Sequence, residues 1–292
     1  MKRLLASFAL AGAFAPAAHA SRIAGSDIVG PVVAAEISGQ VTAAGGRLET
    51  DFRGTFDALR DLRSGKATAA LMFIRNENEV PEIKSGDWAC VPVAYQPVYI
   101  AVHRANGAKE IDLATLAGLY GKTTDTKFDT WRCLPDSGLS QSPLALAPHP
   151  GKGLTVSLVR AEALGGADLR DSVRFAPNDN DAESRALASV NAIVLLSRPP
   201  RSGNLKVLAV ADGRPGKTKQ AYAPTASNLN TGDYPLRITL FAVCRKKDLV
   251  EARPALRAAL SEKIATLLID NGLHPSPENI RKKFSQTLDE TK

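Results

Sequence analysis

Two extended apolar segments, far apart in the sequence, decide how this chain folds. Residues 90–102 read CVPVAYQPVYIAV, and residues 236–243 read LRITLFAV. β-Branched and aromatic side chains dominate both segments, and the prolines of the first are typical of a strand edge or of a crossing between sheets. Alternating strand and helix patterns precede the first segment and also lie between the two. We therefore expect two α/β lobes joined by two hinge strands, with the chain returning at its end to the first lobe.

The patterns before the first segment alternate between strand and helix, which is typical of a mainly parallel sheet. The expected strands are residues 22–25, 47–52 and 67–74, and the expected helices are residues 31–37 and 56–63. In the second helix, Phe56, Leu59 and Leu62 recur at three-residue spacing, which predicts that they share one buried face. Near the other end of the chain, residues 254–269 form the best amphipathic pattern and predict one continuous helix that ends before Gly272.

Composition excludes several classes of protein. The chain has 292 residues, of which 44% are hydrophobic and 23% charged, as in soluble globular proteins, so disorder throughout is excluded. Aromatic residues make up only 5%, which argues against a base-stacking surface and predicts no nucleic-acid partner. The formal net charge of +7 is compatible with anionic ligands but does not identify one.

The first twenty residues have the pattern of a secretory signal peptide. Lys2 and Arg3 precede the apolar residues 4–18, and the small residues of Ala18-His19-Ala20 follow. We predict cleavage after Ala20 and a periplasmic or secreted protein. The mature chain then begins at Ser21, and loss of the two basic residues lowers its net charge to +5.

Cys90, Cys133 and Cys244 allow at most one intramolecular disulfide. Buried free thiols are equally compatible with the sequence. If a bridge forms, we expect it between Cys90 and Cys244, because both lie beside strands of the first lobe. The spacing of the cysteines and histidines matches no metal motif, so we predict neither a metal nor a cofactor.

Three turns place small or hydroxylated residues where a helix is expected to begin. They are Gly25-Ser26-Asp27, Arg53-Gly54-Thr55 and Lys152-Gly153-Leu154-Thr155. The free N–H groups at a helix N-terminus can hold an oxyanion, although ordinary capping uses the same residue types. The acidic Asp27 is compatible with an anion if it accepts a proton from the ligand or pairs with Arg53 or Arg75.

The sequence contains a complete motif for neither a nucleotide-hydrolysing enzyme nor a serine hydrolase. Residues 211–218, ADGRPGKT, fit a relaxed phosphate-binding loop, but residues 219–235 lack the helical pattern that should follow it. A Gly-x-Ser-x-Gly nucleophile turn is absent from the sequence. We therefore predict that the protein is not an enzyme.

Five stretches in chain order resemble the periplasmic phosphate-binding proteins, the solute receptors of phosphate ABC transporters. These stretches are GSDIVGP at 25–31, VPVAYQPVYIAV at 91–102, DLATLAGLYGK at 112–122 with Trp131 downstream, NAIVL at 191–195, and YAPT at 222–225 followed by residues 228–241. The resemblance spans residues 21–292. It implies a type 2 periplasmic-binding-protein fold, with residues 21–100 and 235–292 in the first lobe and residues 101–234 in the second.

The resemblance also implies a ligand site between the lobes. In the second lobe, the family carries an Arg followed closely by Ser-Gly-Thr, where this chain has HPGKGLT at residues 149–155. The residues implied to bind ligand are Ser26, Asp27, Gly54, Thr55, Arg75, His149, Lys152, Gly153 and Thr155. The expected ligand is an inorganic, phosphate-like oxyanion, the expected partner is a membrane ABC permease, and the expected state is a monomer. The alternative is an envelope interaction or signalling protein that kept this fold and lost anion binding.

Overall fold

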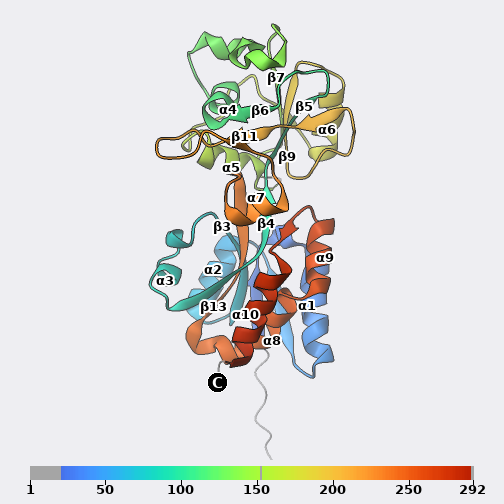
Figure 1. Ribbon diagram of the computed structural model, residues 1–292. Coiled ribbons are helices and arrows are strands. Elements are labelled where there is room, and N and C mark those ends of the chain that lie inside the picture. The colour runs from blue at the N-terminus through green and yellow to red at the C-terminus, as the bar shows by residue number, and fades with distance from the viewer. Residues whose placement is uncertain (1–20, 152, 291–292) are drawn as a thin grey trace, which may run out of the picture.

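The computed structural model describes residues 21–151 and 153–290. The expected signal peptide and Lys152 lie outside the described residues. The described chain forms two lobes, each built on a mixed sheet with helices packed against it (Figure 1). This arrangement confirms the predicted two-lobed α/β architecture.

The first lobe contains a six-stranded sheet in the order β14-β4-β13-β3-β1-β2. Strands β2, β1 and β3 are parallel, and β13 runs antiparallel between β3 and β4. The strands of this lobe are β1 (Ser21–Gly25), β2 (Leu48–Phe52), β3 (Ala69–Ile74), β4 (Trp88–Pro97), β13 (Arg237–Arg245) and β14 (His274–Pro275). Its helices are α1 (Pro31–Ala43), α2 (Thr55–Ser64), α3 (Pro81–Lys84), α8 (Leu249–Ala259), α9 (Glu262–Asp270) and α10 (Glu278–Glu290).

The second lobe contains a five-stranded sheet in the order β10-β5-β9-β7-β8 and a small sheet in the order β12-β11-β6. Its strands are β5 (Tyr99–His103), β6 (Glu110–Asp112), β7 (Leu144–Pro148), β8 (Arg174–Ala176), β9 (Ala192–Leu196), β10 (Leu205–Val207), β11 (Ala209–Ala211) and β12 (Ala221–Tyr222). Its helices are α4 (Leu113–Tyr120), α5 (Thr155–Glu162), α6 (Asp179–Leu187) and α7 (Ala226–Thr231). The 3-10 turns of the two lobes are η1 (Asp27–Val29), η2 (Glu77–Glu79), η3 (Thr126–Asp129), η4 (Trp131–Cys133), η5 (Pro135–Ser137) and η6 (Lys246–Asp248).

Strand β3 lies at the centre of the first lobe and all of its residues are buried. Successive side chains of a strand point to opposite faces of its sheet. Leu71 therefore packs into the apolar cluster that contains α1, α8 and α9, whereas Met72 packs into the cluster that contains α2 and α3. Burial on both faces explains why this strand reads as a continuous apolar run in the sequence.

The chain passes between the lobes twice, and the two crossings are hydrogen-bonded to each other. The segment predicted as one extended strand over residues 91–102 is divided at Val98 into β4 and β5, which belong to different sheets. The Val98 N–H donates to the Leu236 carbonyl at 2.9 Å, and the Tyr234 hydroxyl donates to the Val98 carbonyl at 2.5 Å. At the start of β5, the Tyr99 hydroxyl lies 2.5 Å from Nε2 of His274 on β14.

The helix predicted over residues 254–269 is two helices in the structure. Helix α8 begins earlier, at Leu249, and ends at Ala259, and α9 begins at Glu262. Ser261 separates them because its hydroxyl accepts a hydrogen bond from the Ile264 N–H at 3.3 Å and caps the second helix. The apolar spacing continues across this break, so periodicity alone could not reveal it.

All three cysteines have free thiols, and the strand register explains why a Cys90–Cys244 bridge is excluded. Cys90 pairs with Val243 in the ladder between β4 and β13, and Cys244 pairs with Ala89. Directly paired residues share a face of the sheet and neighbours along a strand do not, so the two thiols point to opposite faces. Cys133 lies in the second lobe, in η4.

We predict that a chain ending at Tyr234 fails to form the first lobe. Such a chain lacks β13, whose residues Leu240 and Val243 are fully buried between β3 and β4. The product should be insoluble, or should lose the cooperative unfolding transition of the full mature chain in urea. A soluble fragment of residues 21–234 whose unfolding free energy depends on urea as steeply as that of the full mature chain would contradict the two-crossing fold.

We also predict that the native thiols react slowly with a disulfide reagent at pH 8. Burial raises the pKa of Cys244 to about 12 and also raises the pKa of Cys90 and Cys133. Since the thiolate is the reactive form, little of it exists at this pH. After denaturation in guanidinium, all three thiols should titrate. If only one thiol titrates after denaturation, the other two form a disulfide, which would contradict the orientation of Cys90 and Cys244 on opposite faces of the sheet.

Candidate ligand-binding cleft

A cleft of about 840 Å³ lies between the lobes and takes residues from both. The first lobe contributes the first turns of α2, the end of β3 and the following turn, together with Ile238 of β13. The second lobe contributes one side of α5, through Leu154, Ser157 and Leu158, and the turn that contains Gly165. A cavity bounded by two lobes that are joined by a hinge can open and close around a small molecule.

Helix α2 begins at the edge of this cleft without a side-chain cap. Its N-cap residue is Gly54, whose φ of 141° lies in a region that favours glycine, and a Cβ at this position would meet no atom within 4 Å. The Thr55 hydroxyl accepts a hydrogen bond from the Phe73 N–H at 3.2 Å and so fixes the helix start against β3. The first N–H groups of α2 are therefore left for other partners, and they carry the partial positive charge of the helix N-terminus.

The two predicted turns of the first lobe lie next to each other at the carboxyl edge of the sheet. The Gly54 N–H donates to the Gly25 carbonyl at 3.0 Å. Ser26 is buried, and its hydroxyl caps η1 by accepting a hydrogen bond from the Ile28 N–H at 3.4 Å. Asp27 is exposed and does not pair with Arg53 or Arg75, since both arginines have other carboxylate partners. Among the predicted first-lobe residues, only Thr55 and Arg75 line the cleft.

The predicted second-lobe residues are spread around the start of α5. Thr155 is buried beneath the helix start and does not line the cleft, whereas its neighbour Leu154 does. Gly153 is exposed with a φ of 118°, and α5 also begins without a side-chain cap. His149 is exposed, packs beside the Phe175 ring and lies 2.6 Å through Nδ1 from the Pro150 carbonyl. Lys152, as stated above, is not described.

A chain of ion pairs crosses the cleft from one lobe to the other. Arg75, at the end of β3, lies 2.7 Å from Glu79 in its own lobe and 3.8 Å from Glu162 of α5. Glu162 in turn lies 3.5 Å from Arg214, which pairs with Asp212 at 2.5 Å. Positive and negative groups thus alternate, so the guanidinium of Arg75 is already balanced by carboxylates. The Arg75 side chain is 42% exposed, and a single pair of this kind contributes at most about 1 kcal/mol.

Several residues that line the cleft were not predicted, and most of them are apolar. Phe56 was expected in the core but is 88% exposed at the first turn of α2, whereas Leu62 is buried. Three-residue spacing falls short of a full helical turn, so the stripe rotates around α2 and carries Phe56 away from the sheet. On α5, the spacing of Leu154, Leu158 and Ala161 marks one helical face, but sequence does not distinguish a cleft face from a core face.

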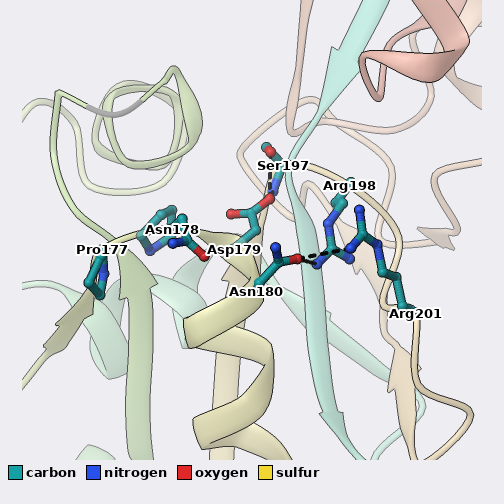
Figure 2. Close-up of a pocket in the computed structure, with 8 residues that line it drawn as sticks. Pro177, Asn178, Asp179, Asn180, Ser197, Arg198 and Arg201 are labelled. Atoms are coloured by element: carbon teal, nitrogen blue, oxygen red, sulfur yellow. Dashed lines mark hydrogen bonds between the residues drawn. The ribbon is translucent and has the colours of Figure 1, made fainter.

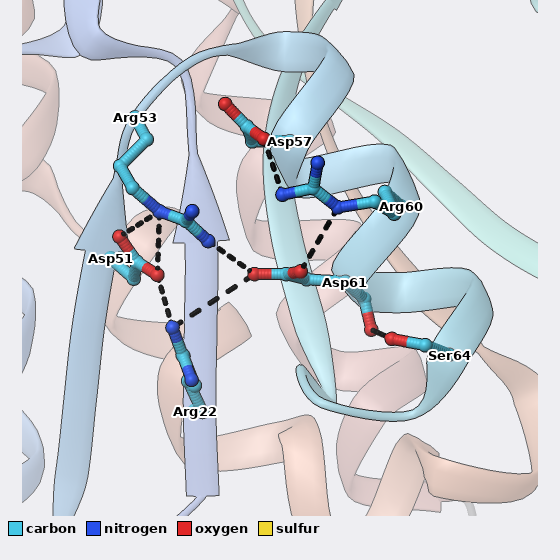
Figure 3. A network of polar contacts seen from close by, with 7 residues as sticks. All are labelled: Arg22, Asp51, Arg53, Asp57, Arg60, Asp61 and Ser64. Atoms are coloured by element: carbon cyan, nitrogen blue, oxygen red, sulfur yellow. Dashed lines mark hydrogen bonds and ion pairs between the residues drawn. The ribbon is translucent and has the colours of Figure 1, made fainter.

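Figure 3 shows how Arg53, beside the start of α2, is held within the first lobe. Its guanidinium lies 2.7 Å from Asp51 of β2 and 2.7 Å from Asp61 of α2. Arg22 of β1 also bonds to Asp51, and Asp61 is only 2% exposed. This network ties β1, β2 and α2 together and gives Arg53 a structural role away from the cleft.

We predict that this network makes the free energy of unfolding depend on pH, through the ionisation of Asp51. Hydrogen bonds from Arg53, and then from Arg22, outweigh the effect of burial and lower the pKa of Asp51. A carboxyl group whose pKa is lower in the folded state stabilises the protein above the unfolded pKa of about 3.9, and this contribution is lost as the pH falls through the folded pKa. The free energy of unfolding in urea should therefore decrease below about pH 4, and Asp51→Asn should make this decrease smaller.

The matched control for this prediction is Asp171→Asn. The Asp171 side chain is 96% exposed and has one distant partner, Lys122, at 3.6 Å. This variant should keep the acid dependence of the unmodified protein. Equal acid dependence in all three proteins would show that the Asp51 network does not contribute.

A second cavity lies at the carboxyl edge of the second sheet, beside the start of α6 (Figure 2). Asp179 accepts hydrogen bonds from the Ser197 N–H at 2.9 Å and hydroxyl at 2.5 Å, Arg198 pairs with Glu183 at 2.8 Å, and the Arg201 guanidinium donates to the Asn180 side-chain oxygen at 3.2 Å. Burial disfavours the ionised form of Glu183, but the N–H groups of Ser202 and Arg201 and the Arg198 guanidinium together lower its pKa. These bonds fix the loop after β9 to α6. Within the described part of the chain, no group of three or more His, Cys, Asp or Glu side chains is placed to hold a metal ion.

The two-lobed architecture and the interlobe cleft define a periplasmic-binding-protein type of molecule. The chain belongs to the PBP superfamily, whose domain model matches residues 13–260. This match confirms the predicted family and fold class. No curated protein sequence matches the chain.

Solved structures with this fold include several described as phosphate-binding. A possible phosphate-binding protein from Planctomyces limnophilus aligns with a TM-score of 0.73 at 19% identity, over 93% of this chain and 98% of the other. An ABC-type phosphate transport receptor from Vibrio cholerae aligns with a TM-score of 0.65 at 15% identity, over 87% of this chain and 99% of the other. PstS from Borrelia burgdorferi aligns with a TM-score of 0.69 at 12% identity, over 87% and 98%. At these low sequence identities, the similarity shows that the proteins share a fold.

Proposed function

We propose that this protein is an exported solute-binding protein that captures an oxyanion, phosphate or a similar group, between its lobes. The observation that carries this proposal is the uncapped N-terminus of α2, which opens at Thr55 into a cleft whose opposite wall belongs to α5 of the second lobe. Unpaired N–H groups at a helix N-terminus attract anions. Closure of the lobes brings the second wall onto a ligand held by the first.

In this proposal the first lobe binds the anion through the turns at Ser26-Asp27 and Gly54-Thr55, with Arg75 supplying charge. The second lobe closes over it with the segment from His149 to Thr155, including Lys152 and Gly153. The function is binding rather than catalysis, and the partner is a membrane ABC permease that receives the solute from a monomeric protein in the periplasm. Every helix of the described residues is too short or too polar to cross a bilayer.

The second candidate is an envelope interaction or signalling protein that kept the fold and lost the anion. Two observations favour it. Arg75 already lies between two carboxylates, Glu79 and Glu162, so its charge is balanced without a ligand. At the start of α5, Leu154 presents an apolar side chain to the cleft, and this side chain offers no hydrogen bond to an anion.

We predict that the mature chain binds an oxyanion and that Thr55→Ala weakens binding by about 1–3 kcal/mol, as expected when a hydrogen bond to a charged group is lost. Isothermal titration calorimetry with phosphate, sulfate and larger oxyanions measures the affinity. Small-angle scattering should show a smaller radius of gyration with the best ligand, because it contacts both lobes only when they close.

The control is Thr42→Ala, which removes a threonine hydroxyl from the exposed surface of α1 without changing the cleft. This variant should bind as the unmodified protein does. If no oxyanion binds and the radius of gyration does not change, the interaction or signalling candidate is favoured instead.

A further inference from the structure

The walls of the interlobe cleft are apolar on both sides. On the first lobe the apolar lining comes from α2, from the end of β3, from the turn after it and from β13, and on the second lobe it comes from α5. The lining residues include Phe56, Leu59 and Ile238 of the first lobe and Leu154, Leu158 and Ala161 of the second. Phe56 is the most exposed large apolar side chain among those described, at 88%. An exposed aromatic ring inside a cleft is typical of a surface that a ligand covers.

The cleft is also much larger than an inorganic oxyanion needs. Its volume of about 840 Å³ lies in the range of pockets that hold organic molecules. A tetrahedral oxyanion has five heavy atoms and displaces only a few water molecules of about 30 Å³ each. Against walls of Phe56 and Leu158, such an ion would lose water without gaining hydrogen bonds in return.

The charges in the cleft favour a ligand with one small anionic group and an uncharged body. Arg75 is shared between Glu79 and Glu162, so the side chains offer little net positive charge to a bare, highly charged ion. The N–H groups at the start of α2 offer a partial positive charge at one place, next to Thr55. The ring of Phe56 follows directly on the same helix, so a polar group and an apolar surface lie side by side.

From this juxtaposition we propose that the ligand is an organic oxyanion with an apolar substituent about the size of an aromatic ring. The oxyanion binds at the start of α2, beside Thr55, and the substituent lies between Phe56 and the Leu154–Leu158 side of α5. This inference rests on the proposed function and narrows it, because it replaces inorganic phosphate with a phosphate group carried on an apolar body.

The test compares the affinities of the full mature chain for phenyl phosphate, inorganic phosphate and phenol by calorimetry. Phenyl phosphate should bind at least tenfold more tightly than inorganic phosphate, and also at least tenfold more tightly than phenol. Phe56→Ala should weaken binding of phenyl phosphate at least fivefold more than it weakens binding of inorganic phosphate. Because Phe56 is exposed, this variant should keep the melting temperature of the unmodified protein.

The matched control is Val32→Ala. Val32 is an apolar residue at the first turn of α1, 61% exposed, and it does not line the cleft. This variant should bind phenyl phosphate as the unmodified protein does, and an equal loss in both variants would overturn the assignment of the apolar wall.

The remaining outcomes separate the two proposals. If inorganic phosphate binds as tightly as phenyl phosphate, the organic ligand is wrong and the anion-binding function stands. If phenol binds as tightly as phenyl phosphate, the anionic group does not contribute and both proposals are wrong. If neither phosphate compound binds, the organic phosphate ligand is wrong, and the titrations with sulfate and larger oxyanions decide whether the anion-binding function stands.

Discussion

Strand β13 forms antiparallel ladders with β3 on one side and β4 on the other, so the first sheet cannot close until the chain has passed through the second lobe and returned. The two crossings this requires lie side by side, joined by the hydrogen bonds between Val98 and the Tyr234–Leu236 segment. The lobes are joined along this line, through the Tyr99–His274 contact and through the ion pair between Arg75 and Glu162, and the cleft lies between the facing surfaces of α2 and α5. The contacts that complete the first lobe are of long sequence range, which is typical of slowly formed structure.

The same arrangement decides what the cleft offers to a ligand. Parallel strands end at one edge of the first sheet, so the helix that follows β2 begins there, with its N–H groups and its first side chains at the cleft. In α2 this places an uncapped N-terminus at Gly54 directly before an exposed ring, Phe56. The cleft therefore has the unpaired N–H groups of a helix start and an apolar surface side by side.

The two-lobed fold could be predicted because the strands that define it are recognisable from short stretches of sequence. The apolar run at residues 69–74 has the length and composition of a doubly buried strand, and the two hinge segments are distinct in character. The break at Ser261 was missed because a capping serine inside a continuous apolar pattern changes no periodicity. The exposure of Phe56 could not be predicted because it depends on where α2 begins relative to the edge of the sheet. That position is set by tertiary packing and not by the local sequence.

The candidate site was harder to predict for a related reason. Capping residues and anion-binding residues are the same types, and in the structure Ser26 caps η1 while Thr55 borders the cleft. Arg53 pairs with carboxylates of β2 and α2, and Arg75 pairs with one carboxylate of the following turn and one of the other lobe. No spacing in the sequence predicts these ion pairs. The opposite orientation of Cys90 and Cys244 follows from a one-residue difference in register between two strands far apart in the chain.

If the proposed anion binds in the cleft, the balanced charges around Arg75 imply that its association rate and its dissociation rate have different physical origins. Long-range attraction of an anion comes from the net positive charge of the whole molecule, which dissolved salt screens over about 8 Å under physiological conditions. The lifetime of the complex depends instead on short-range contacts between the lobes, where Glu79 and Glu162 already neutralise the guanidinium. For the proposed organic anion, a higher ionic strength should therefore slow association and leave dissociation nearly constant, and burial of the apolar walls should give binding a negative change in heat capacity.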